Sequence, residues 1–112
     1  MIDAGMNDLV RPALYGARHR IEPVLAATPG AQWQVVGPVC ESADDFGLHA
    51  LGSRVPEQVV IRDAGAYGFA MSSNYNTRPR PAEVMVDGDR MHLIRAREML
   101  DDLWRGEQML TG

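Results

Sequence analysis

The stretch Trp33-Gln34-Val35-Val36-Gly37-Pro38-Val39-Cys40-Glu41-Ser42 joins a clear strand pattern to two chemically active side chains. Its apolar residues predict a strand over residues 32–39 that is closed by glycine and proline. Cys40 is the only cysteine of the chain, and Glu41 follows it directly. A thiol beside a carboxylate at a strand end is suited to proton transfer, although a free cysteine commonly packs as a small hydrophobic residue.

The composition predicts one globular domain with no nucleic-acid or membrane partner. The chain has 112 residues, 46% of them hydrophobic, which is enough to bury a core. A net charge of −4 provides no attraction for nucleic acid or for an anionic membrane. No apolar run approaches the roughly 20 residues of a membrane span, and the N-terminus lacks a signal-peptide pattern. Because a single cysteine forms no internal disulfide, a reducing cytoplasm is the expected location.

The basic and metal-ligating residues exclude two kinds of chemistry. All 11 basic residues are arginines, so the chain contains no lysine. Schiff-base catalysis and the covalent anchoring of pyridoxal phosphate (PLP) both need a lysine amine, so this chain alone is expected to do neither. No histidine or cysteine pair has the spacing of a metal site, and no metal is expected.

Two further segments carry side chains suited to ligand binding. Arg11 and Tyr15 share a face if their segment is helical, and a guanidinium beside a phenol suits a carboxylate. The alternative is a surface arginine and a half-buried tyrosine. In Asp63-Ala64-Gly65-Ala66-Tyr67-Gly68, the glycines would let a ligand approach the backbone while the phenol of Tyr67 projects toward it. The alternative is a glycine-rich bend with a packed aromatic ring.

The remaining pattern predicts a mainly β fold. Strands are expected over residues 18–25, with Pro23 near the end, and over residues 59–61. Asp87-Gly88 between apolar runs predicts a hairpin, and we expect both of its faces to be covered. Residues 44–57 are expected to form a loop, and residues 97–104 a short amphipathic helix. Several strands before one helix predict an all-β sandwich or partly closed barrel.

Four stretches in this order resemble the C-terminal region of the PLP-dependent diaminopimelate decarboxylases. They are DAGMNDLVRPALYG (3–16), VCES (39–42), DAGAYG (63–68) and SNYNTRPRPAE (73–83). The resemblance covers nearly the whole chain. It implies that residues 1–112 form a single C-terminal β domain, and that the α/β barrel carrying the PLP lysine is absent. It also implies an active site between the subunits of a dimer.

The same resemblance implies a role for five residues. Cys40 resembles the proton donor to the carbanion that decarboxylation leaves, and Glu41 resembles a contact for the distal ammonium of the substrate. Arg11 and Tyr15 resemble substrate-binding groups, and Tyr67 resembles the residue that contacts both PLP and substrate.

Three functions are compatible with these features. The first is the C-terminal portion of a diaminopimelate decarboxylase, which converts meso-diaminopimelate to L-lysine and CO₂ for lysine biosynthesis. In this case a separate barrel-domain chain, or a homodimer, completes the PLP site around the amino-acid substrate. The second is a catalytically inactive β-domain remnant or dimerisation module. The third is a small-molecule binder that uses Arg11 and Tyr15 for an amino acid.

Overall fold

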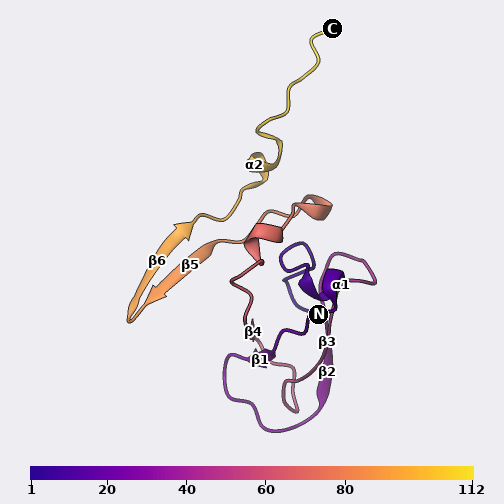
Figure 1. Cartoon of the computed structure of the whole chain (residues 1–112), viewed down its shortest axis with the longest axis vertical. Coiled ribbons are helices and arrows are strands. Elements are labelled where there is room, and N and C mark those ends of the chain that lie inside the picture. The colour runs from indigo at the N-terminus through magenta and orange to yellow at the C-terminus, as the bar shows by residue number, and fades with distance from the viewer. The chain divides into compact units, whose positions relative to one another are not determined.

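Strand pairs, all antiparallel, make up most of the regular structure. The computed structural model describes residues 1–112 (Figure 1). Its three two-stranded sheets are β1 (Ile21–Pro23) with β4 (Val59–Ile61), β2 (Gln32–Val36) with β3 (Asp45–Ala50), and β5 (Glu83–Asp87) with β6 (Arg90–Arg95). The mainly β prediction is confirmed, and the finer prediction of a sandwich or partly closed barrel stays a prediction.

The helices are short. They are α1 (Arg11–Tyr15), α2 (Leu100–Trp104) and the 3₁₀ segments η1 (Phe69–Met71) and η2 (Tyr75–Thr77). The predicted C-terminal helix is confirmed as α2, which is shorter than expected. None of the helices has the length and apolar character needed to cross a membrane.

The chain divides into two compact units. The first, Met1–Ser72, contains α1, β1 to β4 and η1, and the second, Ser73–Gly112, contains η2, β5, β6 and α2. All five predicted site residues belong to the first unit, so its internal structure decides how they are placed.

The first unit has a small apolar core. Its buried members come from the segment before α1, from β1, β2 and β3, and from the residue after β3, and they are Leu9, Ile21, Val35, Phe46 and Leu51. Full burial of such side chains contributes about 1.5–3 kcal/mol each. Trp33 packs against this core and donates its indole N–H to the carbonyl of Gly52 at 2.8 Å. The core therefore joins both strand pairs of the unit.

Two predictions about β2 and the segment that follows it are wrong. β2 ends at Val36, so Gly37 and Pro38 belong to the loop that carries Cys40. Residues 44–57, expected to form a loop, contain β3. A register shift opposite Val35 and Val36 leaves an extra residue in β3, with Gly47 at a φ of 87°. This bulge places the buried residues Phe46 and His49 three apart, which hides the period-two pattern of a strand.

The predicted hairpin is confirmed as β5 and β6. Asp87 pairs with Arg90, so the turn comprises Gly88 and Asp89, one residue later than the predicted Asp-Gly turn. Gly88 has a φ of 61°, which a side chain at this position would disfavour.

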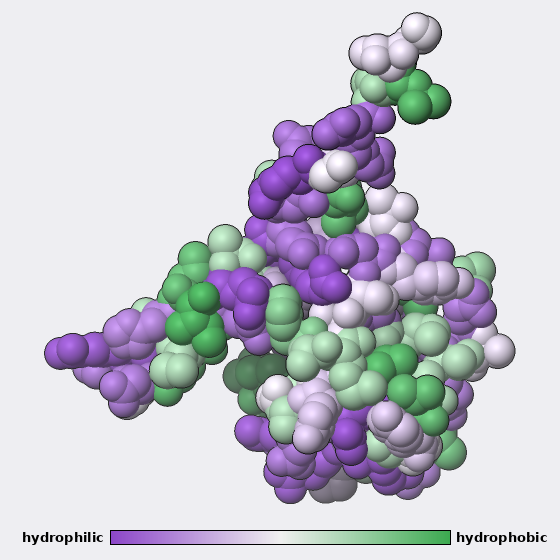
Figure 2. All heavy atoms as spheres, turned by 45° about the horizontal axis from the view of Figure 1, so that its top comes forward, coloured by the Kyte–Doolittle hydropathy of each residue, from purple (hydrophilic) through white to green (hydrophobic).

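The expectation that both hairpin faces are covered is wrong for this chain. Figure 2 shows green apolar spheres along the hairpin at the left of the view. The exposed apolar side chains from both strands are Val84, Met85, Val86, Met91, Leu93 and Ile94, between 51% and 78% accessible. Both faces therefore present apolar surface.

Candidate functional site

Helix α1 positions the first two predicted binding residues. Pro12 lies in its first turn, where a missing N–H costs little, and Gly16 ends the helix in the left-handed conformation. Because Arg11 and Tyr15 are four residues apart, one helical turn brings them together, as predicted. The guanidinium carbon of Arg11 lies 5.8 Å from the centre of the Tyr15 ring.

Tyr67 joins this pair from the turn that follows β4. The guanidinium carbon of Arg11 lies 5.6 Å from the centre of its ring, so Arg11 contacts both tyrosines. The Tyr67 side chain is 61% exposed, which leaves the phenol accessible to a ligand. Arg11, Tyr15 and Tyr67 thus form one cationic and aromatic cluster, which we call the Arg11 cluster.

The two glycines beside Tyr67 have different surroundings. A Cβ on Gly68 would lie 2.1 Å from the carbonyl oxygen of Ala64, whereas a Cβ on Gly65 would meet nothing within 4 Å. Gly68 therefore permits close approach within the chain itself, and the resulting turn projects the Tyr67 side chain outward. Ala64 occupies the space beside Gly68, the space beside Gly65 is open, and the approach of a ligand to this backbone stays a prediction.

Cys40 and Glu41 lie on the loop between β2 and β3, and both are exposed. Cys40 is a free thiol with a φ of 60°, and Tyr67 has a φ of 59°. A non-glycine residue in this left-handed region costs roughly 1–2 kcal/mol, and such residues cluster at functional sites. Two of the five predicted site residues therefore have strained backbones. The ring contacts of Arg11 join it to Tyr15 and Tyr67 and do not include Cys40 or Glu41.

Asp44 shapes this loop and was missed by the sequence reasoning. It is 3% exposed, and its carboxylate accepts hydrogen bonds from the backbone N–H of Met6 at 2.7 Å and of Val39 at 2.8 Å. Nothing in the sequence distinguishes Asp44 from its exposed neighbour Asp45. In the structure, Gly37 lies so close to Asp44 that a Cβ on it would be 2.3 Å from Asp44 Oδ1, and this contact is not visible in the sequence.

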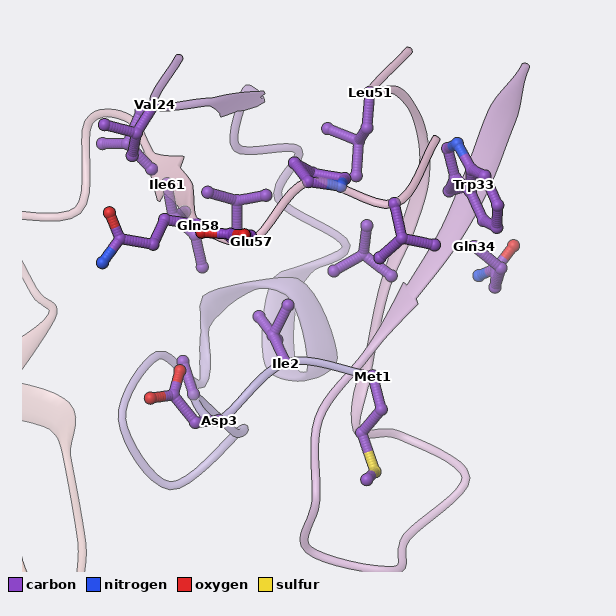
Figure 3. A pocket seen from close by; sticks show the side chains of 16 residues that line it. Met1, Ile2, Asp3, Val24, Trp33, Gln34, Leu51, Glu57, Gln58 and Ile61 are labelled. Carbon is purple, nitrogen blue, oxygen red and sulfur yellow. The ribbon is translucent and has the colours of Figure 1, made fainter. Parts of the chain in front are cut away.

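A cavity in the first unit lies elsewhere. It has a volume of about 840 Å³, and Figure 3 shows Ile2, Trp33, Leu51 and Ile61 around it. Strands β2 and β4 both line it, and none of the five predicted site residues does. This cavity is therefore distinct from the Arg11 cluster and from the Cys40 loop.

Each of the two strands has one edge that faces away from its partner strand. The Val36 carbonyl accepts the N–H of Ile2, on the side of β2 away from β3. By strand alternation, the backbone groups of Gln34 face the same side. In β4, Gln58 and Arg62 bond to the β1 side, so the backbone groups of Val59 and Ile61 face away from β1. The cavity is thus lined by residues of two strands whose outer edges, apart from the bond between Val36 and Ile2, pair with no other strand.

The comparisons with known proteins agree on one family. The sequence model described as "Pyridoxal-dependent decarboxylase, C-terminal sheet domain" matches residues 1–65. Proteins named diaminopimelate decarboxylase from Vibrio cholerae and Archaeoglobus fulgidus are 52% and 47% identical to the chain, over 98% and 91% of its length. The chain spans only 27% and 25% of those relatives, about a quarter of their length.

Solved structures give the same result. A crystal structure of diaminopimelate decarboxylase from M. jannaschii in complex with L-lysine has a TM-score of 0.90 and 39% identity. The match covers 98% of this chain and 26% of that one. The chain therefore belongs to the pyridoxal-dependent decarboxylase family, in which it corresponds to the C-terminal sheet domain of the diaminopimelate decarboxylases.

Proposed function

We propose that this chain is the substrate-facing C-terminal portion of a diaminopimelate decarboxylase, which converts meso-diaminopimelate to L-lysine and CO₂. The observation that carries the proposal is the Arg11 cluster, because a cation held between two accessible phenols is a site for a carboxylate. The relatives that the chain matches are named diaminopimelate decarboxylase. In this reading residues 1–112 act as one β domain, and an α/β barrel supplies the rest of the site.

The substrate is an amino acid with two carboxylates and two amines, and the proposed residues divide these groups. Arg11 binds a carboxylate through its planar guanidinium, and Tyr15 and Tyr67 orient it by donating phenolic hydrogen bonds. Glu41, exposed on the Cys40 loop, binds the distal ammonium. Opposite charges at two points would set both the orientation and the length of the substrate.

The fit of PLP to these residues is partial. The chain has no lysine for covalent anchoring, so that bond belongs to the barrel. The accessible phenol of Tyr67 beside the Arg11 guanidinium fits a contact with an anionic cofactor from this side. When bound, PLP supplies an electron sink for the bond that releases CO₂.

Cys40 acts after the carboxylate has left. Its thiol holds a proton at Sγ and donates it to the substrate carbon that lost CO₂, and the resulting thiolate regains a proton from water. The strained backbone at Cys40 supports this role, because strain is retained where it directs a functional side chain. Cytoplasmic location is part of the same proposal, since the thiol must stay reduced.

A barrel-domain polypeptide is the proposed partner, either as a separate chain or within a dimer of complete subunits. The relatives are about four times as long as the matched region, so most of their structure lies outside it. The free edges of β2 and β4 and the exposed apolar hairpin support burial against such a partner. The same exposed hairpin supports a second candidate function, an inactive dimerisation module.

Lysine formation tests the proposal. We would supply meso-diaminopimelate and PLP to this chain alone, and then to its mixture with the remaining part of the Vibrio cholerae relative. We expect no L-lysine from the chain alone and L-lysine from the mixture. Cys40→Ala should lower kcat in the mixture by about 10²–10⁴, the usual contribution of a positioned proton donor, with Cys40→Ser as the isosteric comparison. A mixture that forms a complex without producing lysine would favour the dimerisation module.

A further inference from the structure

Asp44 makes four hydrogen bonds that together define the Cys40 loop. Its carboxylate accepts the N–H of Val39 at 2.8 Å and the N–H of Met6 at 2.7 Å. Its backbone N–H donates to the Glu41 carbonyl at 3.0 Å, and its backbone carbonyl accepts the N–H of Gly37 at 2.9 Å. One buried residue therefore binds the loop on both sides of Cys40, and it also binds Met6 in a separate segment.

Gly37 makes room for this carboxylate. A Cβ on Gly37 would lie 2.3 Å from Asp44 Oδ1 and 2.4 Å from Oδ2, distances that side-chain carbons do not adopt. The backbone of the loop thus comes so close to Asp44 that only glycine fits. Because Asp44 is buried, its carboxylate has little choice of rotamer once the two amides are bound.

The loop needs such a restraint because Cys40 is strained. Its φ of 60° turns the chain so that the thiol is exposed, while the preceding residue Val39 is only 2% exposed. A free loop would relax Cys40 to an ordinary backbone conformation and redirect the thiol. The hydrogen bond from Val39 to Asp44 opposes this relaxation at the adjacent peptide.

We propose that Asp44 is a positioning residue that holds the backbone of Cys40 and Glu41 in the conformation from which they act. The proposal rests on the proposed function for the roles of these two residues. Through Met6, the same carboxylate also binds the turn that leads into α1, where Gly5 accepts the N–H groups of Asp8 and Leu9. Asp44 therefore restrains the Cys40 loop against the segment that precedes Arg11.

Amide exchange tests the geometry without any need for activity. In the 112-residue chain mixed with the barrel polypeptide, the amides of Met6 and Val39 should exchange slowly although both lie outside strands and helices. Asp44→Asn retains the size of the side chain but replaces one acceptor oxygen by a donor group. It should lower protection at one or both amides by about ten- to a hundredfold, the loss expected for hydrogen bonds to a charged group.

Two further variants refine the test. Gly37→Ala should give the same local loss of protection, because its Cβ displaces the Asp44 carboxylate. Asp89→Asn, a matched change at an exposed turn residue, should leave both amides protected. Wild-type Met6 and Val39 amides that exchange as fast as exposed loop amides would overturn the proposal even if every variant failed to fold.

Kinetics separates positioning from general stability. In the active mixture, Asp44→Asn should lower kcat about tenfold or more while KM changes less than about threefold, because the proton donor is displaced and the Arg11 cluster remains. Loss of amide protection with unchanged kcat would overturn the positioning role. A wild-type mixture that makes no lysine would contradict the proposed function, and amide exchange would still decide whether Asp44 holds the loop.

Discussion

Arg11 contacts two tyrosine rings in the proposed site. Its guanidinium carbon lies within 6 Å of two tyrosine ring centres, at 5.8 Å and 5.6 Å. Contacts of this type contribute about 0.5–1 kcal/mol each at accessible sites. They hold the guanidinium in place for a carboxylate while leaving its N–H groups available.

Replacement of Arg11 should weaken substrate binding. We expect Arg11→Lys to raise KM about tenfold in the active mixture, because an ammonium retains the charge but loses planar, two-point binding. Arg11→Ala should raise KM further, about a hundredfold. Steady-state kinetics with meso-diaminopimelate measures both effects.

Arg54 provides the matched control for Arg11. It is an exposed arginine of the same unit, outside the Arg11 cluster. Arg54→Ala should leave KM within about twofold of the wild-type value. Equal effects at Arg54 and Arg11 would show that net charge, rather than the cluster, binds the substrate.

The backbone conformation of Cys40 should lower the stability of the folded chain. Both Cys40→Ala and Cys40→Gly remove the thiol, but only glycine adopts a φ of 60° without cost. We expect Cys40→Gly to have a free energy of unfolding about 1 kcal/mol higher than Cys40→Ala. Urea unfolding of the two variants measures the difference, and a less stable glycine variant would show that the strain at Cys40 is negligible.

At the scale of secondary structure, the bulge in β3 depends on Gly47. Its φ is 87°, and a Cβ would meet no atom within 4 Å, so the backbone conformation alone would oppose substitution. Gly47→Ala should lower the free energy of unfolding of the first unit by about 1–2 kcal/mol. Denaturant unfolding checks this value.

Gly65 is the matched control for Gly47. Its Cβ would also meet nothing within 4 Å, and its φ is not in the left-handed region. Gly65→Ala should therefore be neutral, or slightly stabilising because it restricts the unfolded chain. If Gly65→Ala lowered the free energy of unfolding as much as Gly47→Ala does, the role of the bulge would be contradicted.

In the second unit, Glu98 links the segment that precedes β5 to the segment that follows β6. Its carboxylate accepts hydrogen bonds from the Arg80 backbone N–H and from Asn74 Nδ2, both at 2.7 Å, and pairs with the Arg80 guanidinium at 3.1 Å. The backbone hydrogen bond from Arg80 is the main cause that lowers the pKa of Glu98, although partial burial opposes it. The charged form is therefore favoured in the folded state.

This lowered pKa predicts a loss of stability in acid. The contribution of Glu98 is fully present above the ordinary pKa that its carboxyl group has in the unfolded chain, and it is lost as the pH falls through the lower folded pKa. The stability difference between wild type and Glu98→Gln should therefore be larger at pH 7 than at pH 3. Urea unfolding at both pH values measures it. Glu107→Gln in the exposed tail is the control. A stability difference between wild type and Glu98→Gln that is larger at pH 3 than at pH 7 would contradict the lowered pKa of Glu98.

At the scale of the whole molecule, exposed apolar surface should make the chain bind a partner. The hairpin side chains Met85, Met91 and Leu93 are more than half exposed. We expect the chain to bind an apolar fluorescent dye and to release it when the barrel polypeptide is added. Dye titration measures both steps, and dye that stays bound in the complex would show that this surface is not covered.

The family and the mainly β fold were predictable from the sequence because they depend on local signals. The hairpin follows from a glycine-containing turn between apolar runs, whereas the sequence indicated only that Arg11 and Tyr15 would share a face if their segment were helical, as it is in α1. Four motifs in order were sufficient to indicate the decarboxylase family, which the comparisons confirm. These features need no knowledge of which distant residues meet.

Long-range contacts were decided only by the tertiary structure. The contact of Tyr67 with Arg11 joins residues separated by most of the first unit, and the burial of Asp44 depends on how closely Gly37 and Met6 approach it. The bulge at Gly47 hid β3 because it breaks the alternation that identifies a strand. The sequence by itself determined most of the local elements and the residues capable of chemistry. Only the folded chain selected which of them lie together, because that selection depends on packing between segments that no local pattern specifies.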